Sequence, residues 1–385
     1  AIKEHFGNQA LQKWDDKKVV ARDPKTLEKY RTMLVDQIQY FKVTQYFFFK
    51  QWSELKDYAN QRGIKIIGDM PIYVAADSVE VWAKPELFQL DKERNPLFVA
   101  GVPADQFSAT GQLWGNPLYD WKEHKKQGYT WWIHRIEESF KIYDVLRIDH
   151  FKGFSDYWQV DGKADIAKYG TWQPGPGYDL FKVVKEQLGD LPIIAEDLGN
   201  IDEKARKLLT DCNYPGMKIL QFGFEDVSGK SLDSPHYCIP HSIAYTGTHD
   251  NDVTNGWYNG LTAQQQQYIN DYTHRHNDES ICQAMIRQLF ATVNNTAIAT
   301  MQDILDSPAS SRMNLPSTIG GNWQWRMQKS DLTQDKKDFL AKMTTLYQRA
   351  NQEIPMIKFS TFVKNKTNKS LEQLSDKETY IQLLN

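Results

Sequence analysis

The chain has 385 residues, which is enough for one large α/β barrel or two ordinary domains. Charged residues make up 25% of it and the formal net charge is −3, so there is no electrostatic basis for binding nucleic acid or an anionic membrane. No apolar run approaches the roughly 20 residues of a membrane-spanning helix, and three widely separated cysteines give neither a disulfide framework nor a metal-binding spacing. We therefore expect a cytoplasmic protein that binds neither nucleic acid nor a membrane.

Helical patterns dominate the first part of the chain. Residues 1–62 are expected to be a helical segment that ends at Gly63, because glycine readily adopts the left-handed conformation that follows many helices. Residues 70–130 form a long insertion rich in proline and glycine, and a loop of that length inside a domain usually has a function. Further helices are predicted at 131–143, 178–188, 202–210 and 262–295.

Short apolar runs between these helices are predicted to be strands, at 64–69, 144–149, 191–196, 217–222, 243–248 and 297–301. Strands that alternate with helices predict a parallel α/β fold, and polar residues at strand ends favour a TIM (β/α)8 barrel with long βα-loop insertions. Because such a barrel has more strands than these six, we expect the chain to lack the first strands of the barrel. The expected organisation is a helical segment at 1–62, a catalytic barrel at 63–350 and a C-terminal extension at 351–385.

Three of the predicted strands lead into carboxylates, namely Asp149, Glu196 and Asp250. The C-terminal ends of parallel strands meet at one edge of a barrel, so we expect these acids to share one site. Two carboxylates on either side of a glycosidic bond are the usual equipment of glycoside chemistry. Arg147 lies on the same side of its strand as Asp149 and would keep that aspartate ionised, whereas burial or the adjacent Asp197 would raise the pKa of Glu196. Taken singly, each acid could instead be an ion-pair partner or a helix cap.

Aromatic residues are abundant, with 12 Trp, 19 Tyr and 18 Phe. Several lie in segments rich in glycine and proline that are predicted to be loops: Trp114, Tyr119, Trp121, Trp158, Trp172, Trp257 and Tyr258. Loops run over the surface, where exposed rings could stack on the apolar faces of sugars, although any one of them could be a core residue. A metal-assisted barrel hydrolase is an alternative, but the His274–His276 pair lies in a polar, helical stretch rather than at a strand end.

Several longer segments are similar to the amylomaltases, the 4-α-glucanotransferases of bacterial maltodextrin metabolism. The segments are RIDHFKGF (147–154), IIAEDLG (193–199), YTGTHDND (245–252), GDMPIYVAADSVEVWAKPELF (68–88), GVPADQFSATGQLWGNPLYDW (101–121), GMKILQF (216–222) and RMNLPSTIGGNWQWR (312–326). The resemblance covers about residues 60 to 350. It implies a retaining transfer of α-1,4-glucan segments from a maltodextrin donor to the 4-hydroxyl of an acceptor glucan or glucose.

The resemblance also implies roles for individual residues. Asp149 would be the nucleophile that forms a covalent glucosyl intermediate, Glu196 the general acid and base, and Asp250 the stabiliser of the transition state. The residues expected to bind substrate are Arg147, His249, Asp105, Gln112, Trp114 and Asn314. The expected partners are maltooligosaccharides and α-1,4-glucans, with no metal and no cofactor. A retaining α-glucan hydrolase remains an alternative, as does a glucan-binding fragment that is not catalytic because its barrel is incomplete.

Overall fold

The computed structural model describes residues 1–104, 108–199, 201–316, 318 and 320–350. The chain divides into two compact units, of which the first comprises Ala1–Lys218 with His241–Ile243 and the second comprises Ile219–Pro240 with Ala244–Asn385. The expected C-terminal extension at 351–385 lies outside the described residues. Within the described part, no helix is long and apolar enough to cross a bilayer.

The first unit contains a parallel sheet of three strands. Its strands are β1 (Ile67–Met70), β4 (Val145–Ile148) and β7 (Ile193–Ala195), in the spatial order β1-β4-β7. The register places Asp69 opposite Arg147 and places Arg147 opposite Ile194. Each strand lies within or beside a predicted one, and the parallel pairing brings the C-terminal ends of all three strands to the same edge.

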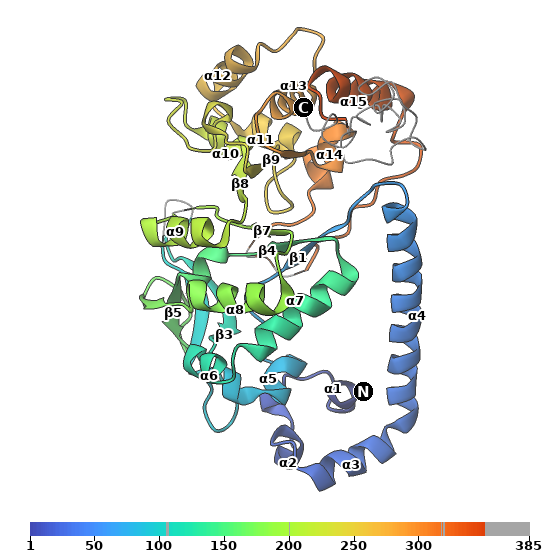
Figure 1. The fold of residues 1–385 in the computed structure, drawn as a ribbon, viewed down its shortest axis with the longest axis vertical. Coiled ribbons are helices and arrows are strands. Elements are labelled where there is room, and N and C mark those ends of the chain that lie inside the picture. The colour runs from blue at the N-terminus through green and yellow to red at the C-terminus, as the bar shows by residue number, and fades with distance from the viewer. Residues whose placement is uncertain (105–107, 200, 317, 319, 351–385) are drawn as a thin grey trace, which may run out of the picture. The chain divides into compact units, whose positions relative to one another are not determined.

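Helices alternate with these strands along the chain. They are α7 (Thr130–Ile142) before β4, α8 (Tyr178–Leu188) before β7 and α9 (Glu203–Cys212) after β7. Their apolar faces enter the main core of the unit, which includes Ile136, Leu180 and Leu208. Figure 1 shows α7 and α8 beside the sheet. All three helices agree with the predicted ones to within about two residues, as expected for amphipathic segments.

The first unit also contains a four-stranded antiparallel sheet in segments that were expected to be loops. The strands are β2 (Phe98–Val102), β3 (Gln112–Pro117), β5 (Asp156–Asp161) and β6 (Gly170–Pro174), in the order β3-β2-β5-β6. Between them lie α5 (Val79–Ala83), η2 (Pro85–Leu87), α6 (Trp121–Lys126) and η3 (Phe151–Phe154). The insertion at 70–130 is therefore largely ordered structure.

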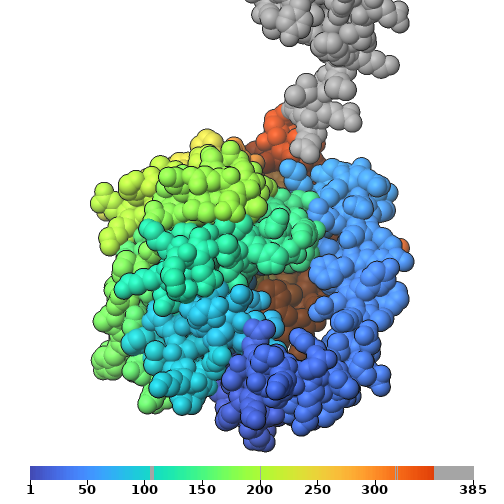
Figure 2. Space-filling model, turned by 60° about the horizontal axis from the view of Figure 1, so that its bottom comes forward, coloured from blue at the N-terminus to red at the C-terminus, as the bar shows by residue number. Residues whose placement is uncertain are grey.

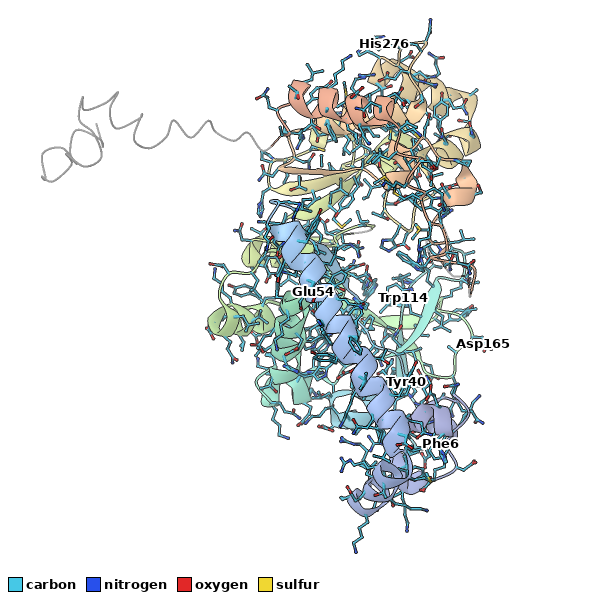
Figure 3. All side chains as sticks on the ribbon, turned by 90° about the vertical axis from the view of Figure 1, so that its right-hand side faces the viewer. Phe6, Tyr40, Glu54, Trp114, Asp165 and His276 are labelled. Carbon is cyan, nitrogen blue, oxygen red and sulfur yellow. The ribbon has the colours of Figure 1, made fainter. Side chains whose placement is uncertain are left out.

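Helices occupy most of residues 1–62, as expected. They are α1 (Ile2–His5), η1 (Leu11–Lys13), α2 (Lys17–Val20), α3 (Pro24–Met33) and α4 (Val35–Asn60). The first four helices share a small core with the start of α4, but α4 itself has no buried residue. It lies at the surface in Figure 2, and Tyr40 and Glu54 mark its course in Figure 3. Trp52 Nε1 donates to Ile142 O at 2.9 Å and Lys56 Nζ lies 2.6 Å from Asp144 Oδ1, so these contacts attach the C-terminal part of α4 to the parallel sheet.

The second unit is mainly helical. Strands β8 (Gly216–Ile219), β9 (Ser242–Tyr245) and β10 (Thr296–Ile298) are ordered β10-β9-β8, and the chain passes between the units within β8 and β9. The remaining elements are α10 (Leu220–Glu225), η4 (Pro235–Tyr237), α11 (Thr254–Gly260), α12 (Ala263–Thr273), α13 (Ile281–Phe290), α14 (Met301–Ile304), η5 (Ala309–Ser311) and α15 (Gln334–Leu346). The predicted strand at 217–222 ends early because α10 begins at Leu220, and the one at 297–301 ends early because Thr300 caps α14.

Most of the aromatic residues that were expected on surface loops belong to cores. Tyr119 is 1% exposed and its hydroxyl donates to Ile72 O at 2.6 Å, and Trp121 packs against the same core. Trp257 and Tyr258 pack against the core of the second unit. Of the seven predicted platforms, Trp114 and Trp172 remain exposed, at 36% and 44%.

Burial of His124 predicts an acid-sensitive core. This side chain is 1% exposed among the rings of Tyr119, Trp121 and Trp131, and burial lowers its pKa to about 4 from an ordinary 6.5. Between pH 6.5 and 4, His124 therefore binds a proton in the unfolded chain but stays neutral in the folded chain. This difference should cost about 3 kcal/mol of the free energy of unfolding as the pH falls to 4.

Urea unfolding at a series of pH values measures this cost. The free energy of unfolding of His124→Phe should fall less steeply between pH 6.5 and 4 than that of the unmodified chain, because phenylalanine cannot be protonated. His134→Gln is the matched control, since the His134 side chain is 69% exposed on α7. Equal slopes for His124→Phe and the unmodified chain would show that His124 does not contribute.

Candidate active site

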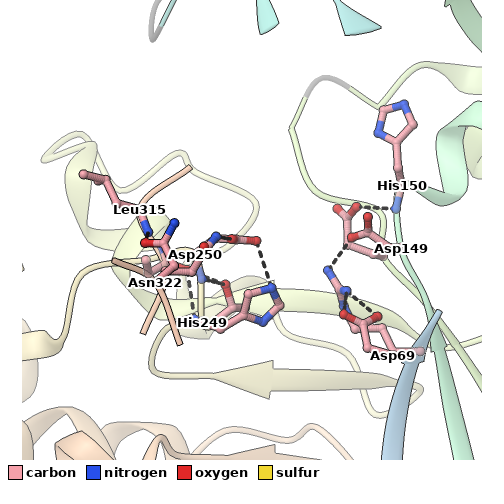
Figure 4. Close-up of polar contacts among 12 residues, drawn as sticks. Asp69, Asp149, His150, His249, Asp250, Leu315 and Asn322 are labelled. Atoms are coloured by element: carbon pink, nitrogen blue, oxygen red, sulfur yellow. Dashed lines mark hydrogen bonds and ion pairs between the residues drawn. The ribbon is translucent and has the colours of Figure 1, made fainter. Parts of the chain in front are cut away.

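Arg147 organises the first group of polar residues, at the end of the parallel sheet. Its side chain is largely buried, and Nη1 donates to both carboxylate oxygens of Asp69 at 2.6 and 2.7 Å. Nη2 lies 3.0 Å from Asp149 Oδ1, and Nε donates to Met217 Sδ at 3.4 Å. Burial alone would lower the pKa of Arg147, but the charges of Asp69, Asp149 and Glu196 outweigh it and raise the pKa. The predicted Arg147–Asp149 pairing is therefore present (Figure 4).

Asp69 is a site residue that sequence reasoning missed. It lies on β1 directly opposite Arg147, and its two oxygens share one guanidinium nitrogen. The signal was available, because the run at 64–69 ends in an acid just as the predicted catalytic strands do. Asp69 therefore holds Arg147 through Nη1, while Asp149 lies against Nη2.

Glu196 follows β7 and is held by the backbone of two neighbouring segments. Its Oε2 accepts from His150 N at 2.8 Å and its Oε1 accepts from Leu198 N at 2.7 Å. Burial raises the pKa of Glu196 to about 7, with a further contribution from the charge of Asp149, against the opposing effects of Arg147 and the two backbone donors. Of the two expected causes of a raised pKa for Glu196, burial is therefore the one that acts. The adjacent Asp197 accepts a hydrogen bond from Met217 N at 2.7 Å.

His150 connects the two acids to the aromatic residues of the antiparallel sheet. It has a left-handed backbone conformation (φ 47°), which turns the chain sharply after Asp149. Its ring lies edge-on to Trp114, with centroids 4.8 Å apart, and Trp114 Nε1 donates to Gln112 Oε1 at 3.2 Å. Burial lowers the pKa of His150 to about 4, so the imidazole is neutral at pH 7. The structure thus brings together Trp114 and Gln112, while Asp105 lies outside the described residues.

A second group of polar residues lies in the second unit, around Asp250. Asn314 Nδ2 donates to Asp250 Oδ1 at 2.6 Å, His249 Nε2 lies 3.2 Å from Asp250 Oδ2, and Arg312 Nη2 donates to Asp250 O at 2.6 Å. The ring of Trp323, which is 52% exposed, packs on His249 with centroids 5.1 Å apart. Three predicted site residues are therefore neighbours here. Arg312 and Trp323 were not predicted as site residues, although both belong to the family-like segment at 312–326.

A tight turn fixes the loop that carries His249 and Asp250. Asn251 Oδ1 accepts from both the backbone N and Oγ1 of Thr248 at 2.9 Å, and Asp250 N donates to Thr248 Oγ1 at 3.3 Å. At the base of the loop, Thr246 Oγ1 donates to the buried Asp303 at 2.6 Å. Asp250 thus lies in a loop whose hydrogen bonds fix both the turn around it and the segment before it. The predicted meeting of Asp250 with Asp149 and Glu196 stays a prediction.

The metal-assisted alternative has one candidate cluster in the described part of the chain. His134, Glu137 and Glu138 lie one helical turn apart on the solvent-facing side of α7. Exposed acidic groups at this spacing are common on helices without a metal. This cluster contains none of Asp149, Glu196 and Asp250.

A pair of carboxyl groups, of which one can be protonated near neutral pH, is used by most enzymes that act on glycosidic bonds. The family model for glycoside hydrolase family 77, described as 4-alpha-glucanotransferase, matches residues 1–333. The chain belongs to this family of 4-alpha-glucanotransferases. The match confirms the resemblance to the amylomaltases and indicates glucan transfer as the activity.

Individual relatives agree with this assignment. The chain is 50% identical over 359 residues to a 4-alpha-glucanotransferase of Streptococcus pneumoniae, covering 93% of this chain and 71% of the relative. It is 43% identical over 353 residues to a 4-alpha-glucanotransferase of Clostridium butyricum, covering 91% and 72%. Among solved structures it is similar to the amylomaltase from Streptococcus agalactiae in complex with acarbose, with a TM-score of 0.90, 59% identity and coverage of 91% and 71%. That likeness confirms the mixed α/β fold.

The raised pKa of Glu196 can be measured directly. In a chain with ¹³C-labelled glutamate, the carboxyl resonance of Glu196 should titrate near pH 7, and it is assigned by its absence from Glu196→Gln. Asp149→Asn removes a negative charge that opposes ionisation, so the pKa of Glu196 should fall in that variant. Asp190→Asn, at an exposed ion pair with Lys185, should leave it unchanged. A titration in the ordinary range of exposed glutamates would contradict the burial argument.

The position of Arg147 should depend on Asp69. Asp69→Asn removes one of the two charges that hold the guanidinium, so Asp149 should be displaced slightly and the turnover of glucan should fall by roughly 100-fold. Initial rates with maltotriose measure this, and Asp69→Glu should recover part of the loss. Asp211→Asn is the control, because Asp211 pairs with the exposed Lys207 on α9. A rate for Asp69→Asn equal to that of the control would show that Asp69 has no positioning role.

Proposed function

We propose that the chain transfers α-1,4-glucan segments between maltooligosaccharides by a retaining double displacement that uses Asp149 and Glu196. The observation that carries the proposal is the difference between these two acids in one unit. Asp149 lies against a buried arginine, which favours the ionised carboxylate that a nucleophile needs. Glu196 has a pKa of about 7, so a large fraction of it is protonated near neutral pH, as a general acid requires.

In the first step, Asp149 attacks C1 of the donor sugar and the bond from C1 to the glycosidic oxygen breaks. Glu196 gives its proton to that oxygen, and the remainder of the donor leaves with a free 4-hydroxyl. In the second step, Glu196 takes the proton from the 4-hydroxyl of an acceptor, whose oxygen attacks C1 and releases Asp149. The two inversions at C1 restore the α configuration, and Glu196 ends in its starting state.

The remaining predicted residues have supporting roles in this proposal. Asp250 is proposed to stabilise the positive charge that develops on the sugar ring, and its hydrogen bond from Asn314 holds its carboxylate in one orientation. Arg147 and His249 are proposed to bind the sugar before the cleaved bond. Trp114, with Asp105 and Gln112, is proposed to line the cleft that binds the glucan.

We also propose that the parallel strands are part of a (β/α)8 barrel over 63–350 with an insertion at 70–130. The order and direction of β1, β4 and β7, with a helix between each consecutive pair, support this. So does the placement of Asp149 and Glu196, each immediately after the C-terminal residue of a strand. Active sites of such barrels are built at this end of the strands.

Incubation with maltotriose tests transfer against hydrolysis. Transfer should produce maltotetraose and longer chains together with glucose and maltose, which chromatography resolves. Asp149→Asn should lower the rate by a factor on the order of 10⁴ or more, as removal of a nucleophile usually does. Asp190→Asn, an exposed aspartate outside the proposed site, is the matched control. Formation of glucose and maltose alone would replace the transferase proposal with the hydrolase alternative.

The covalent intermediate has its own test. Glu196→Gln cannot protonate a sugar leaving group, but α-maltosyl fluoride needs no such protonation. The variant should therefore form the intermediate with this donor and release it slowly, so that mass spectrometry finds a maltosyl group on the peptide containing Asp149. A maltosyl group on another peptide would reassign the nucleophile.

A further inference from the structure

Trp172 is an exposed aromatic side chain that the proposed chemistry does not use. It lies on β6, the edge strand of the antiparallel sheet, opposite Trp158 on β5. The two indoles meet with centroids 5.2 Å apart and planes at 62°, yet 44% of Trp172 remains exposed. Single exposed apolar rings are common on protein surfaces, so what distinguishes Trp172 is its support and its neighbours.

Trp172 rests on a firmly positioned neighbour. Trp158 Nε1 donates to Ala167 O at 2.8 Å, which orients its ring beneath the sheet edge. Gly170 allows this position, because a Cβ atom there would lie 2.7 Å from the indole of Trp158. Residues 170–172 therefore present Trp172 from a support with little freedom to move. A rigid ring loses little conformational entropy when a ligand binds to it.

A charged pair lies beside the ring of Trp172. Lys152 Nζ lies 4.7 Å from its centroid and 3.1 Å from Asp202 Oδ2, and the Lys152 side chain is only 12% exposed. An aromatic ring with an ammonium group and a carboxylate beside it is complementary to a pyranose, which has apolar C–H faces and hydroxyl groups around its edge.

The backbone attaches this platform to the segment that holds Glu196. Lys152 belongs to η3, which begins directly after His150, and His150 N donates to Glu196. At the end of β6, Gly175 N donates to Ser155 O at 2.7 Å, next to the same helix. Because a Cβ at Gly175 would lie 2.3 Å from Phe154 O, glycine is needed for this approach. A glucose residue on Trp172 would therefore lie on the same unit as Asp149 and Glu196.

We propose that Trp172, with Lys152 and Asp202, forms a stacking subsite for one glucose residue of an α-1,4-glucan chain, additional to the residues that act on the cleaved bond. The choice of ligand rests on the proposed function, since a glucan is the polymer that this site would process. A protein strand is a poor fit as the occupant, because Pro174 on β6 has no N–H to offer a pairing strand. The subsite would hold a long donor or acceptor while its end reacts.

Native gels that contain amylose measure the affinity without requiring turnover, if all variants are made in an Asp149→Asn background so that the glucan is not consumed. Trp172→Ala should raise the apparent dissociation constant for amylose by roughly 2- to 10-fold, as expected for the loss of one ring-stacking contact. Trp172→Phe keeps a smaller ring, so its apparent dissociation constant should lie between those of the Asp149→Asn parent and Trp172→Ala. Tyr169→Ala is the control, because Tyr169 is a 72% exposed aromatic residue next to the same strand.

Hydroxyl-radical footprinting of the full chain provides a readout that does not depend on a variant folding. Amylose should protect the peptide containing Trp172 from oxidation, whereas cellohexaose, which is β-linked, should not. Unchanged amylose affinity in Trp172→Ala, an equal loss in Tyr169→Ala, or an unprotected Trp172 would each overturn the subsite. Because both experiments read binding, the absence of longer products from maltotriose would overturn the transferase proposal and leave this subsite standing.

Discussion

The candidate site of the first unit depends on how a buried arginine is neutralised at the end of a parallel sheet. Taking a guanidinium out of water is unfavourable unless carboxylates compensate it with good geometry. The sheet supplies this compensation through its register, because parallel pairing places Asp69 opposite Arg147 and strand alternation places Asp149 on the same side. Met217, in β8, completes the contacts of the guanidinium. The position of Asp149 is therefore a consequence of strand pairing that no local loop could supply.

The strands that alternate with helices were the most predictable part of the fold, because each of the six apolar runs overlaps a strand. Their ends were less predictable. The run at 217–222 passes from β8 into α10, and a continuous apolar run looks the same in a buried strand and in a buried helix. The antiparallel sheet could not be recognised because β3 and β6 contain the glycine and proline residues that usually mark turns. Those strands are stabilised by pairing between distant segments, which a single sequence does not show.

Asp149 and Glu196 each follow an apolar run directly, so local sequence alone places these carboxylates at the ends of β4 and β7. Asp250 lies five residues after the end of β9. Their supporting residues differ in this respect. Arg312 contacts the backbone of Asp250 across 62 positions of sequence, and no local pattern links the two. For Tyr119 the prediction was wrong, because a proline-rich neighbourhood suggested a surface loop. The Tyr119 hydroxyl donates to a backbone carbonyl, and this hydrogen bond allows the side chain to be buried. Contacts between distant segments decide both cases.

Burial around Glu196 has two chemical consequences that bear on transfer. Two backbone N–H groups and Arg147 favour the ionised form of this acid, yet burial and Asp149 outweigh them and bring its pKa to about 7. Burial shifts the pKa of the neighbouring His150 in the opposite direction, because it keeps the imidazole neutral. Both shifts have the same physical cause, which is the burial of these side chains. A transferase must favour a sugar hydroxyl over water as the acceptor. In the proposed mechanism, the desolvation that raises the pKa of Glu196 also disfavours the competing hydrolysis.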